Sequence, residues 1–538
     1  MAADSHFQRN PFFILGATTH DDRRKLVALA EARSLSVENG IGDQARADLT
    51  HLRKRLVAEI AWLPGVPPSS GAGLLERLQS DADSIRRKSD LPALARLNLL
   101  AALWQDLPST TPAPSIEQFA IETGVVADEI SAATVMQDIN LDRAISGFAA
   151  VQSIEDVESE LAERRRFVCS LIRAALDVLP SESVVESMRR IVTASTDDGH
   201  RHASALIDQL VDDYDIDARR VMEQEAATVT SLIASVRDKM VRGSAAIKPY
   251  LRELETVVLN WDRIAQPIQL SYLARGLHHK PSLSVGYAIR NLAIDLWNHY
   301  RIMEESTSLI LLSEKLFAEI PPLVDLLKED RTALASIAES LTYRAEVGRL
   351  FRDTLSISAD SVQWKRRHYR LESITRIRWG SEIRTLVGGV KRTTHTVAFG
   401  DSEHESRIDT SNKEIYSNFI GKLWSTAGIR LLSEFMEILK AGGVVRFGRA
   451  QFRDHGVDLI QIQLFGRKQV VSCAWDQILV KNFNGSLMVS AKHNPRACAN
   501  LSFRDTANVC VLAKALELVL QPPYKERMSA LLTSAVEQ

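Results

Sequence analysis

The chain has 538 residues, of which 45% are hydrophobic and 25% charged, a composition typical of a globular protein with several domains. A formal net charge of -2 excludes a global basic field for nucleic acid, and four scattered cysteines without a C-x-x-C pair predict a reducing compartment. The sequence has no signal-peptide pattern and no run of about 18 apolar residues, so we expect a cytoplasmic protein without a transmembrane segment.

The N-terminal stretch predicts two antiparallel helices. Asn10–Gly16 is a short apolar segment closed by a glycine, and Thr18–Ser34 repeats apolar residues every three and four positions. A second helix is predicted over Asp43–Trp62, ended by Pro64-Gly65. Its apolar stripe consists of Ala45, Leu49, Leu52, Leu56, Ile60 and Leu63. We expect this stripe to pack on the helices that follow.

Phe12-Phe13-Ile14-Leu15-Gly16, together with these two helices, resembles the YxxLG start and the helices of a J domain, the co-chaperone module of DnaJ-type proteins. In that family, stimulation of a DnaK-type ATPase depends on a His-Pro-Asp tripeptide in the loop after the second helix. The corresponding loop here, Ser36–Gly42, has no His-Pro-Asp, and His20-Asp21-Asp22 lies before the helix. The resemblance therefore implies a degenerate J-like domain over residues 1–65 that does not stimulate the ATPase.

The region after the J-like domain is predicted to be helical. A helical linker region over residues 66–114 begins with a turn-rich link, Val66–Gly73. An all-α helical bundle domain is expected over residues 115–354, because apolar residues recur there with the helical period.

Within the bundle, the longest helix is predicted from His202 to Arg242. Pro267 is expected to end one helix and begin the next. The last two helices are predicted over Pro321–Lys328 and Asp330–Arg352.

Near Leu355 the apolar pattern changes to alternation, which indicates strands. The strands of a first unit are predicted at Ile374–Trp379, Ile383–Val387 and Thr394–Phe399, with a hairpin turn at Gly388-Gly389. A helix follows over Lys413–Trp424, and a second one over Ile429–Ala441 connects to the next unit. The same order of strands and one closing helix returns between Val457 and Leu520.

A small antiparallel β unit closed by one helix resembles the pleckstrin-homology (PH-like) superfold. The resemblance implies a first PH-like unit with its connecting helix over residues 355–443 and a second with a C-terminal helix over residues 444–538. The expected fold class is therefore multidomain α+β: an N-terminal J-like helical hairpin, a long all-α middle and two C-terminal PH-like units. The combination resembles bacterial proteins with a degenerate J-like N-terminus.

The sequence contains no recognisable motif for catalysis, metal or cofactor binding. Asp213 begins a D-x-D-x-D pattern, but Ala218 and Gln224 stand where a calcium loop needs glycine and glutamate. There is no phosphate loop, no G-x-S-x-G elbow and no obvious set of converging zinc ligands. We therefore predict no enzyme activity, no cofactor and no metal site.

Basic residues concentrate in the first β unit after Trp364. The candidate residues for binding an anion or a partner are Lys365, Arg366, Arg367, Arg370, Arg376 and Arg378. Arg376 and Arg378 alternate along one predicted strand, so they share a face. Such a face can bind an anionic headgroup or a phosphate backbone, and the alternative is a solvated strand face that prevents edge pairing.

These patterns lead to three hypotheses about function. The first is a non-enzymatic scaffold or adaptor that binds a protein partner through its helical and PH-like modules. The second is peripheral binding to an anionic membrane lipid or to nucleic acid through the basic strand face. The third, a J-domain co-chaperone, is disfavoured by the missing His-Pro-Asp.

Overall fold

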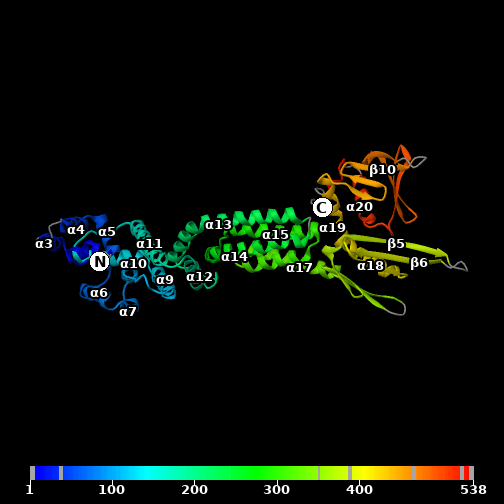
Figure 1. The fold of residues 1–538 in the computed structure, drawn as a ribbon. Coiled ribbons are helices and arrows are strands. Elements are labelled where there is room, and N and C mark those ends of the chain that lie inside the picture. The colour runs from blue at the N-terminus through cyan, green and yellow to red at the C-terminus, as the bar shows by residue number, and fades with distance from the viewer. Residues whose placement is uncertain are drawn as a thin grey trace. The chain divides into compact units, whose positions relative to one another are not determined.

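The computed structural model describes residues 6–34, 40–240, 243–348, 352–385, 391–462, 468–521 and 526–531. The predicted fold class is confirmed: helices occupy the N-terminal and middle parts of the chain, and small antiparallel sheets follow them (Figure 1). The chain divides into two compact units, residues 1–225 with 260–282 and residues 226–259 with 283–538. No helix in the described part of the chain has the length and apolar character needed to cross a membrane.

The first unit contains helices joined by loops, and it has no strand among its described residues. Its helices are α1 His6–Arg9, α2 Pro11–Leu15, α3 Arg23–Ser34, α4 Ile41–Thr50, α5 Leu52–Ile60, α6 Pro68–Ser80, α7 Ala82–Arg86, α8 Ala93–Gln105, α9 Ala113–Asp128, α10 Ala132–Ser146, α11 Ile154–Leu176 and α12 Ser181–Thr196, with parts of α13 Ala205–Lys239 and α14 Ser244–Ala274.

The apolar segment near the N-terminus forms the short helix α2. The Asn10 side chain caps it by accepting a hydrogen bond from the Phe12 amide at 3.0 Å, and Gly16 ends it with a φ of 63°. Phe12 is fully buried, and its ring stacks on that of Trp62 with centroids 5.9 Å apart. These contacts join the start of the chain to the end of the predicted helical pair.

The predicted helix Asp43–Trp62 is wrong in one respect, because it is two helices, α4 and α5. His51 lies between them with an extended ψ of 121°, so the face of α4 does not continue into α5. Leu52, which was expected on the buried stripe, is 52% exposed as a result. Leu56 and Ile60 do pack against later helices, in a buried cluster with Leu94, Val135, Ile139, Val157 and Leu161.

Two other N-terminal predictions have different outcomes. The part of the predicted loop over residues 36–39 lies outside the described residues, and Gly40 begins α4 with a φ of 64°. The turn-rich link Val66–Gly73 is wrong as a link, because α6 begins at Pro68. Proline is favoured in the first turn of a helix, where its missing N–H has no intrahelical partner to lose.

A fully buried triad of charged side chains joins α5 to α10. Glu59 accepts hydrogen bonds from Arg55 Nε at 2.7 Å and from Arg143 Nε and Nη2 at 3.0 and 2.8 Å. The three side chains are no more than 2% exposed. The Arg55 guanidinium also lies 3.7 Å from the centroid of the Phe148 ring. The helices predicted as J-like are therefore fixed to the helices that follow them.

The predicted long helix is confirmed as α13, but the prediction for Pro267 is wrong. Helix α14 continues through this proline. Proline has no N–H to donate to the carbonyl four residues earlier, so carbonyls in this turn need other donors. The Tyr214 hydroxyl donates to the carbonyl of Ile264, in the turn before the proline, at 3.0 Å.

Three further helices precede the strands: α15 Lys280–Tyr300, α16 Met303–Leu316 and α17 Pro321–Leu341. Helix α17 is continuous where Pro321–Lys328 and Asp330–Arg352 were predicted as separate helices. The predicted all-α range also extends too far, because the first strand begins at Tyr343.

The C-terminal region repeats one arrangement twice: a four-stranded antiparallel sheet, a three-stranded antiparallel sheet and a helix. The first β unit contains β1 Tyr343–Val347, β2 Asp353–Ile357, β3 Ser361–Trp364, β4 Arg367–Arg370, β5 Arg376–Thr385, β6 Lys391–Gly400, β7 Glu405–Thr410, α18 Lys413–Leu423, a π-helical turn Trp424–Gly428 and α19 Ile429–Lys440. The second contains β8 Val445–Phe447, β9 Ala450–Arg453, β10 Gly456–Ile462, β11 Lys468–Ala474, β12 Ile478–Phe483, β13 Ser486–Ala491, β14 Asn494–Ser502 and α20 Val509–Val519.

Two antiparallel β units, each followed by a helix, were expected, but the first sheet of each unit is larger than the sequence indicated. Strand β5 contains residues from both predicted strands Ile374–Trp379 and Ile383–Val387, of which the last two residues of the second lie outside the described residues. The predicted hairpin turn at Gly388-Gly389 lies outside the described residues.

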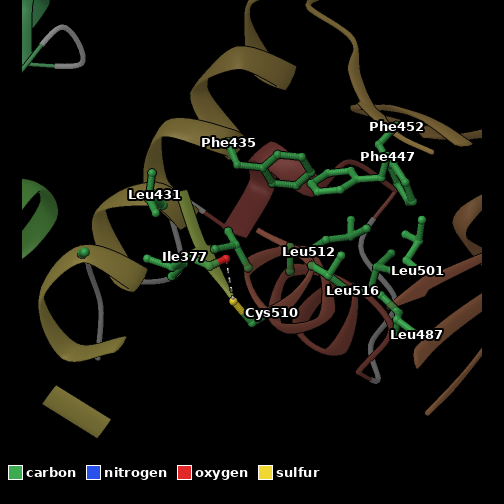
Figure 2. Close-up of a cluster of buried hydrophobic side chains, with 14 of the residues drawn as sticks. Ile377, Leu431, Phe435, Phe447, Phe452, Leu487, Leu501, Cys510, Leu512 and Leu516 are labelled. Atoms are coloured by element: carbon green, nitrogen blue, oxygen red, sulfur yellow. Dashed lines mark hydrogen bonds between the residues drawn. The ribbon is translucent and has the colours of Figure 1, made fainter. Parts of the chain in front are cut away.

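The two β units share one hydrophobic core, shown in part in Figure 2. Ile377 and Leu431 come from the first unit, and Leu487 and Leu512 come from the second. Asn508 adds a polar link between the two units. Its side-chain Oδ1 accepts a hydrogen bond from the Ile377 backbone N–H at 2.9 Å, and its backbone N–H donates to the Ile377 carbonyl at 2.8 Å. The two β units are therefore packed together as one folded body.

Candidate anion-binding groove

The four-stranded sheet of the first β unit has an apolar face and a polar face. Leu355, Ile357 and Val362 point into the core and are no more than 1% exposed. Because side chains alternate along a strand, their neighbours point to the other side of the sheet. The strand register aligns four of these polar residues in one row across β1 to β4: Arg344, Ser356, Gln363 and His368.

A groove of about 970 Å³ runs along this polar face. Hydroxyl and amide side chains line part of it, including Thr354, Ser356, Ser361 and Gln363. The charged residues of its lining are Arg344, Arg352, Lys365, Arg366, Arg367 and Arg407, opposed by Asp353 and Glu405. The excess of cations makes the groove attractive to an anion.

Three of the residues predicted from the sequence lie together at the turn between β3 and β4. Lys365 has a φ of 58°, and its ammonium lies 3.7 Å from Asp353. Arg366 is exposed and has no ion pair within the described ranges. Arg367 donates from Nη1 to the Glu405 carbonyl at 3.3 Å, which keeps its charge at the edge of the groove.

The other three predicted residues do not line the groove, and each is held by other parts of the protein. Arg370 contacts Glu304 at 2.8 Å and Glu372 at 2.9 Å. Arg376 donates from Nε to the Asp401 carbonyl at 2.9 Å.

Arg378 pairs with the Glu405 carboxylate and donates to the Arg504 carbonyl at 2.8 Å. Arg376 and Arg378 do lie on alternate positions of β5, as predicted. Their side chains nevertheless hold loops in place, and neither residue lines the groove.

Three cationic residues of the groove were missed by the sequence analysis. Arg344 is exposed on β1, which was predicted as helix. Arg352 lies 3.4 Å from Glu346, and Arg407 lies 3.1 Å from Asp409. The side chains of both ion pairs are exposed, so these pairs are assigned to the rim of the groove. For Arg407, the alternation in Ser406-Arg407-Ile408-Asp409 was an available signal in the sequence.

Two observations on the described residues concern metal ligands and thiols. No group of three or more His, Cys, Asp or Glu side chains in the described part of the chain is placed to hold a metal ion. Burial raises the pKa of the Cys169 and Cys510 thiols to about 12, so both are protonated near neutral pH. The lining of the groove itself supplies charged groups and hydrogen-bonding groups.

Comparison of the chain with protein-family models and with curated proteins returned no match.

Proposed function

We propose that the protein is a non-enzymatic binding protein whose first β unit holds an anionic ligand in the groove. The observation that carries this proposal is the gathering of six Arg or Lys side chains and only two carboxylates around one hollow of about 970 Å³. Arg344 and Arg366 supply charges that no described carboxylate neutralises by an ion pair. The exposed ion pairs at the rim are weak enough to rearrange around a ligand.

The ligand that fits best is the phosphorylated headgroup of an anionic membrane lipid. The volume of the groove, about 970 Å³, lies within the range of about 300–1,000 Å³ that is typical of pockets for small ligands. Ser356 and Gln363 on the floor can bond headgroup hydroxyls, while Lys365 and Arg366 at the turn can contact phosphate oxygens. A nucleic acid needs a longer track of cations along its backbone.

Vesicle sedimentation tests this proposal with the full-length chain. We expect binding to vesicles that contain phosphorylated inositol lipids, no binding to neutral vesicles, and an affinity that falls as salt rises. Binding to single- or double-stranded DNA in preference to the vesicles would assign the groove to nucleic acid. Absence of binding to either at low salt would contradict the proposal.

The second candidate is an adaptor that binds a protein partner. Strand β12 lies at the edge of its sheet, and it exposes Leu479 by 40% and Phe483 by 68%. An edge strand with exposed apolar side chains can pair with an extended segment of another protein. Affinity capture with the wild type and with Leu479→Ser/Phe483→Ser tests this role. A partner that is retained equally by both proteins would contradict the use of β12.

The J-like resemblance remains a proposal about the fold of residues 1–65. The sequence lacks the His-Pro-Asp on which ATPase stimulation depends in that family, so we do not assign co-chaperone activity. The ATPase rate of a DnaK-type chaperone in the presence of the full chain tests this assignment, and clear stimulation would overturn it.

A further inference from the structure

A second basic pocket lies in the helical unit, far along the sequence from the groove. It has a volume of about 490 Å³. Its cationic side is formed by Arg9, Lys54 and Arg164, and its apolar side includes Pro11, Val57 and Phe167. Asp48 also lines it, but this carboxylate is already paired with Lys54 at 2.8 Å.

Arg164 on α11 is the central feature of this pocket, because it is a buried cation without a counter-ion. The residue is only 7% exposed, and it forms no ion pair with any described carboxylate. Its guanidinium carbon lies 4.6 Å from the centroid of the Phe167 ring. Burial alone lowers the pKa of Arg164 to about 9, which still leaves it charged near neutral pH.

Neutral groups hold this guanidinium in one orientation. Nε donates to Asn98 Oδ1 at 2.6 Å, and the Asn98 amide in turn donates to the Ile60 carbonyl at 2.8 Å. Nη2 lies 2.7 Å from His6 Nε2, while His6 Nδ1 lies 2.8 Å from Gln105 Oε1. Burial and the charge of Arg164 lower the pKa of His6 to about 3, so the imidazole is neutral and Nε2 accepts from the guanidinium.

The remaining guanidinium nitrogen, Nη1, has no hydrogen-bond partner within the described residues, and it is not among the buried polar atoms that lack one. Nη1 is therefore not fully buried, and Arg164 is one of the residues that line the pocket. Arg9 is exposed beside it and has no described ion pair. A fixed guanidinium edge next to flexible cations is an arrangement that suits carboxylate and phosphate oxygens.

We propose that this pocket binds an oxyanion, a carboxylate or phosphate attached to a short apolar segment, with Arg164 as its main contact. The ligand supplies the negative charge that the protein does not place beside Arg164. Its apolar segment lies against Val57 and Phe167.

Calorimetric titration of the full-length protein with hexanoate and with inorganic phosphate tests this proposal. Both titrations use the background Lys365→Glu/Arg366→Glu/Arg367→Glu, so that binding in the sheet groove does not contribute. Binding of hexanoate supports a carboxylate ligand, and binding of phosphate supports a phosphorylated one. Failure of both probes to bind at millimolar concentration would overturn the proposal, whatever the outcome for the sheet groove.

Arg164→Met separates specific from general binding. Loss of charge-assisted hydrogen bonds is expected to weaken the binding of either probe by about ten- to hundredfold. Arg173→Gln removes a half-buried arginine that lies on the same helix, pairs with Asp217 and does not line the pocket, and this variant is expected to bind either probe with unchanged affinity. Equal affinity of the background protein with and without Arg164→Met would overturn the proposal. If Arg164→Met does not fold, Arg9→Gln/Lys54→Gln is tested in its place, because both residues line the pocket and are exposed, so that their substitution leaves the fold intact. Unchanged affinity in this double variant would again overturn the proposal.

Discussion

The buried triad of Arg55, Glu59 and Arg143 gives a stability prediction that follows directly from its geometry. Glu59→Gln preserves the shape of the side chain but removes the carboxylate that both guanidinium groups contact. Two positive charges then remain buried with a neutral amide between them. Removing one partner of a buried ion pair typically costs about 3–5 kcal/mol, a large share of the roughly 5–15 kcal/mol that stabilises a domain.

Hydrogen exchange measured peptide by peptide is the suitable assay, because a chain of several domains does not unfold in one step. Amides of α5 and α10 should exchange about a hundredfold faster or more in Glu59→Gln, which corresponds to the expected loss of stability. The matched control is Glu163→Gln on α11, which breaks an exposed pair with Arg166 and should cost less than about 0.5 kcal/mol. Equal exchange of α5 and α10 in the two variants would refute the role given to the triad.

Two further predictions concern Asn508 and His6. Asn508→Ala should destabilise the joined β units by about 1–3 kcal/mol in urea unfolding, because the buried Ile377 amide loses its acceptor. A loss no larger than that of Asn484→Ala, at an exposed residue that also has a positive φ, would contradict this. Burial and Arg164 lower the pKa of His6 from 6.5 to about 3 in the folded protein. Between about pH 3 and pH 6.5 the unfolded chain therefore binds the extra proton, and the wild type loses stability as pH falls. His6→Gln removes this proton binding and should flatten the pH dependence of stability in that range. Identical pH profiles of the variant and the wild type would contradict that account.

Long helices were predictable, but their interruptions were not. The predicted helix His202–Arg242 includes all of α13, since many apolar residues contribute to the pattern. No proline or glycine lies at the break between α4 and α5, so a local pattern does not predict it. Leu52, which follows His51, was therefore placed on the wrong face. Conversely, Pro267 suggested a break that α14 does not have. Whether a turn continues depends on partners from other helices, which a local pattern does not contain.

The β region shows a similar limit. The ten-residue strands β5 and β6 gave enough alternation to be found, at least in part. The four-residue strands β3 and β4 are too short for a period of two to be distinguished from a loop. The sequence therefore located the repeated β units but underestimated their sheets.

The candidate site was predictable where neighbours in sequence are also neighbours in space. Lys365, Arg366 and Arg367 are consecutive, so a single turn brings them together. Arg370 and Arg378 looked equivalent to them, but their partners Glu304 and Glu405 lie 66 and 27 positions away. Only the fold shows that those two charges are already neutralised.

The central claim is that the groove on the first β unit binds an anion through a defined set of side chains. The most direct measurement compares vesicle binding by two triple variants with the same change in charge. Lys365→Glu/Arg366→Glu/Arg367→Glu alters the groove, whereas Arg384→Glu/Lys391→Glu/Arg392→Glu alters exposed residues near the other end of β5 and β6. We expect the first variant to lose binding to vesicles containing phosphorylated inositol lipids and the second to bind nearly as well as the wild type. Equal losses in both variants would contradict the account, because binding would then follow the charge of the whole β unit and not the groove.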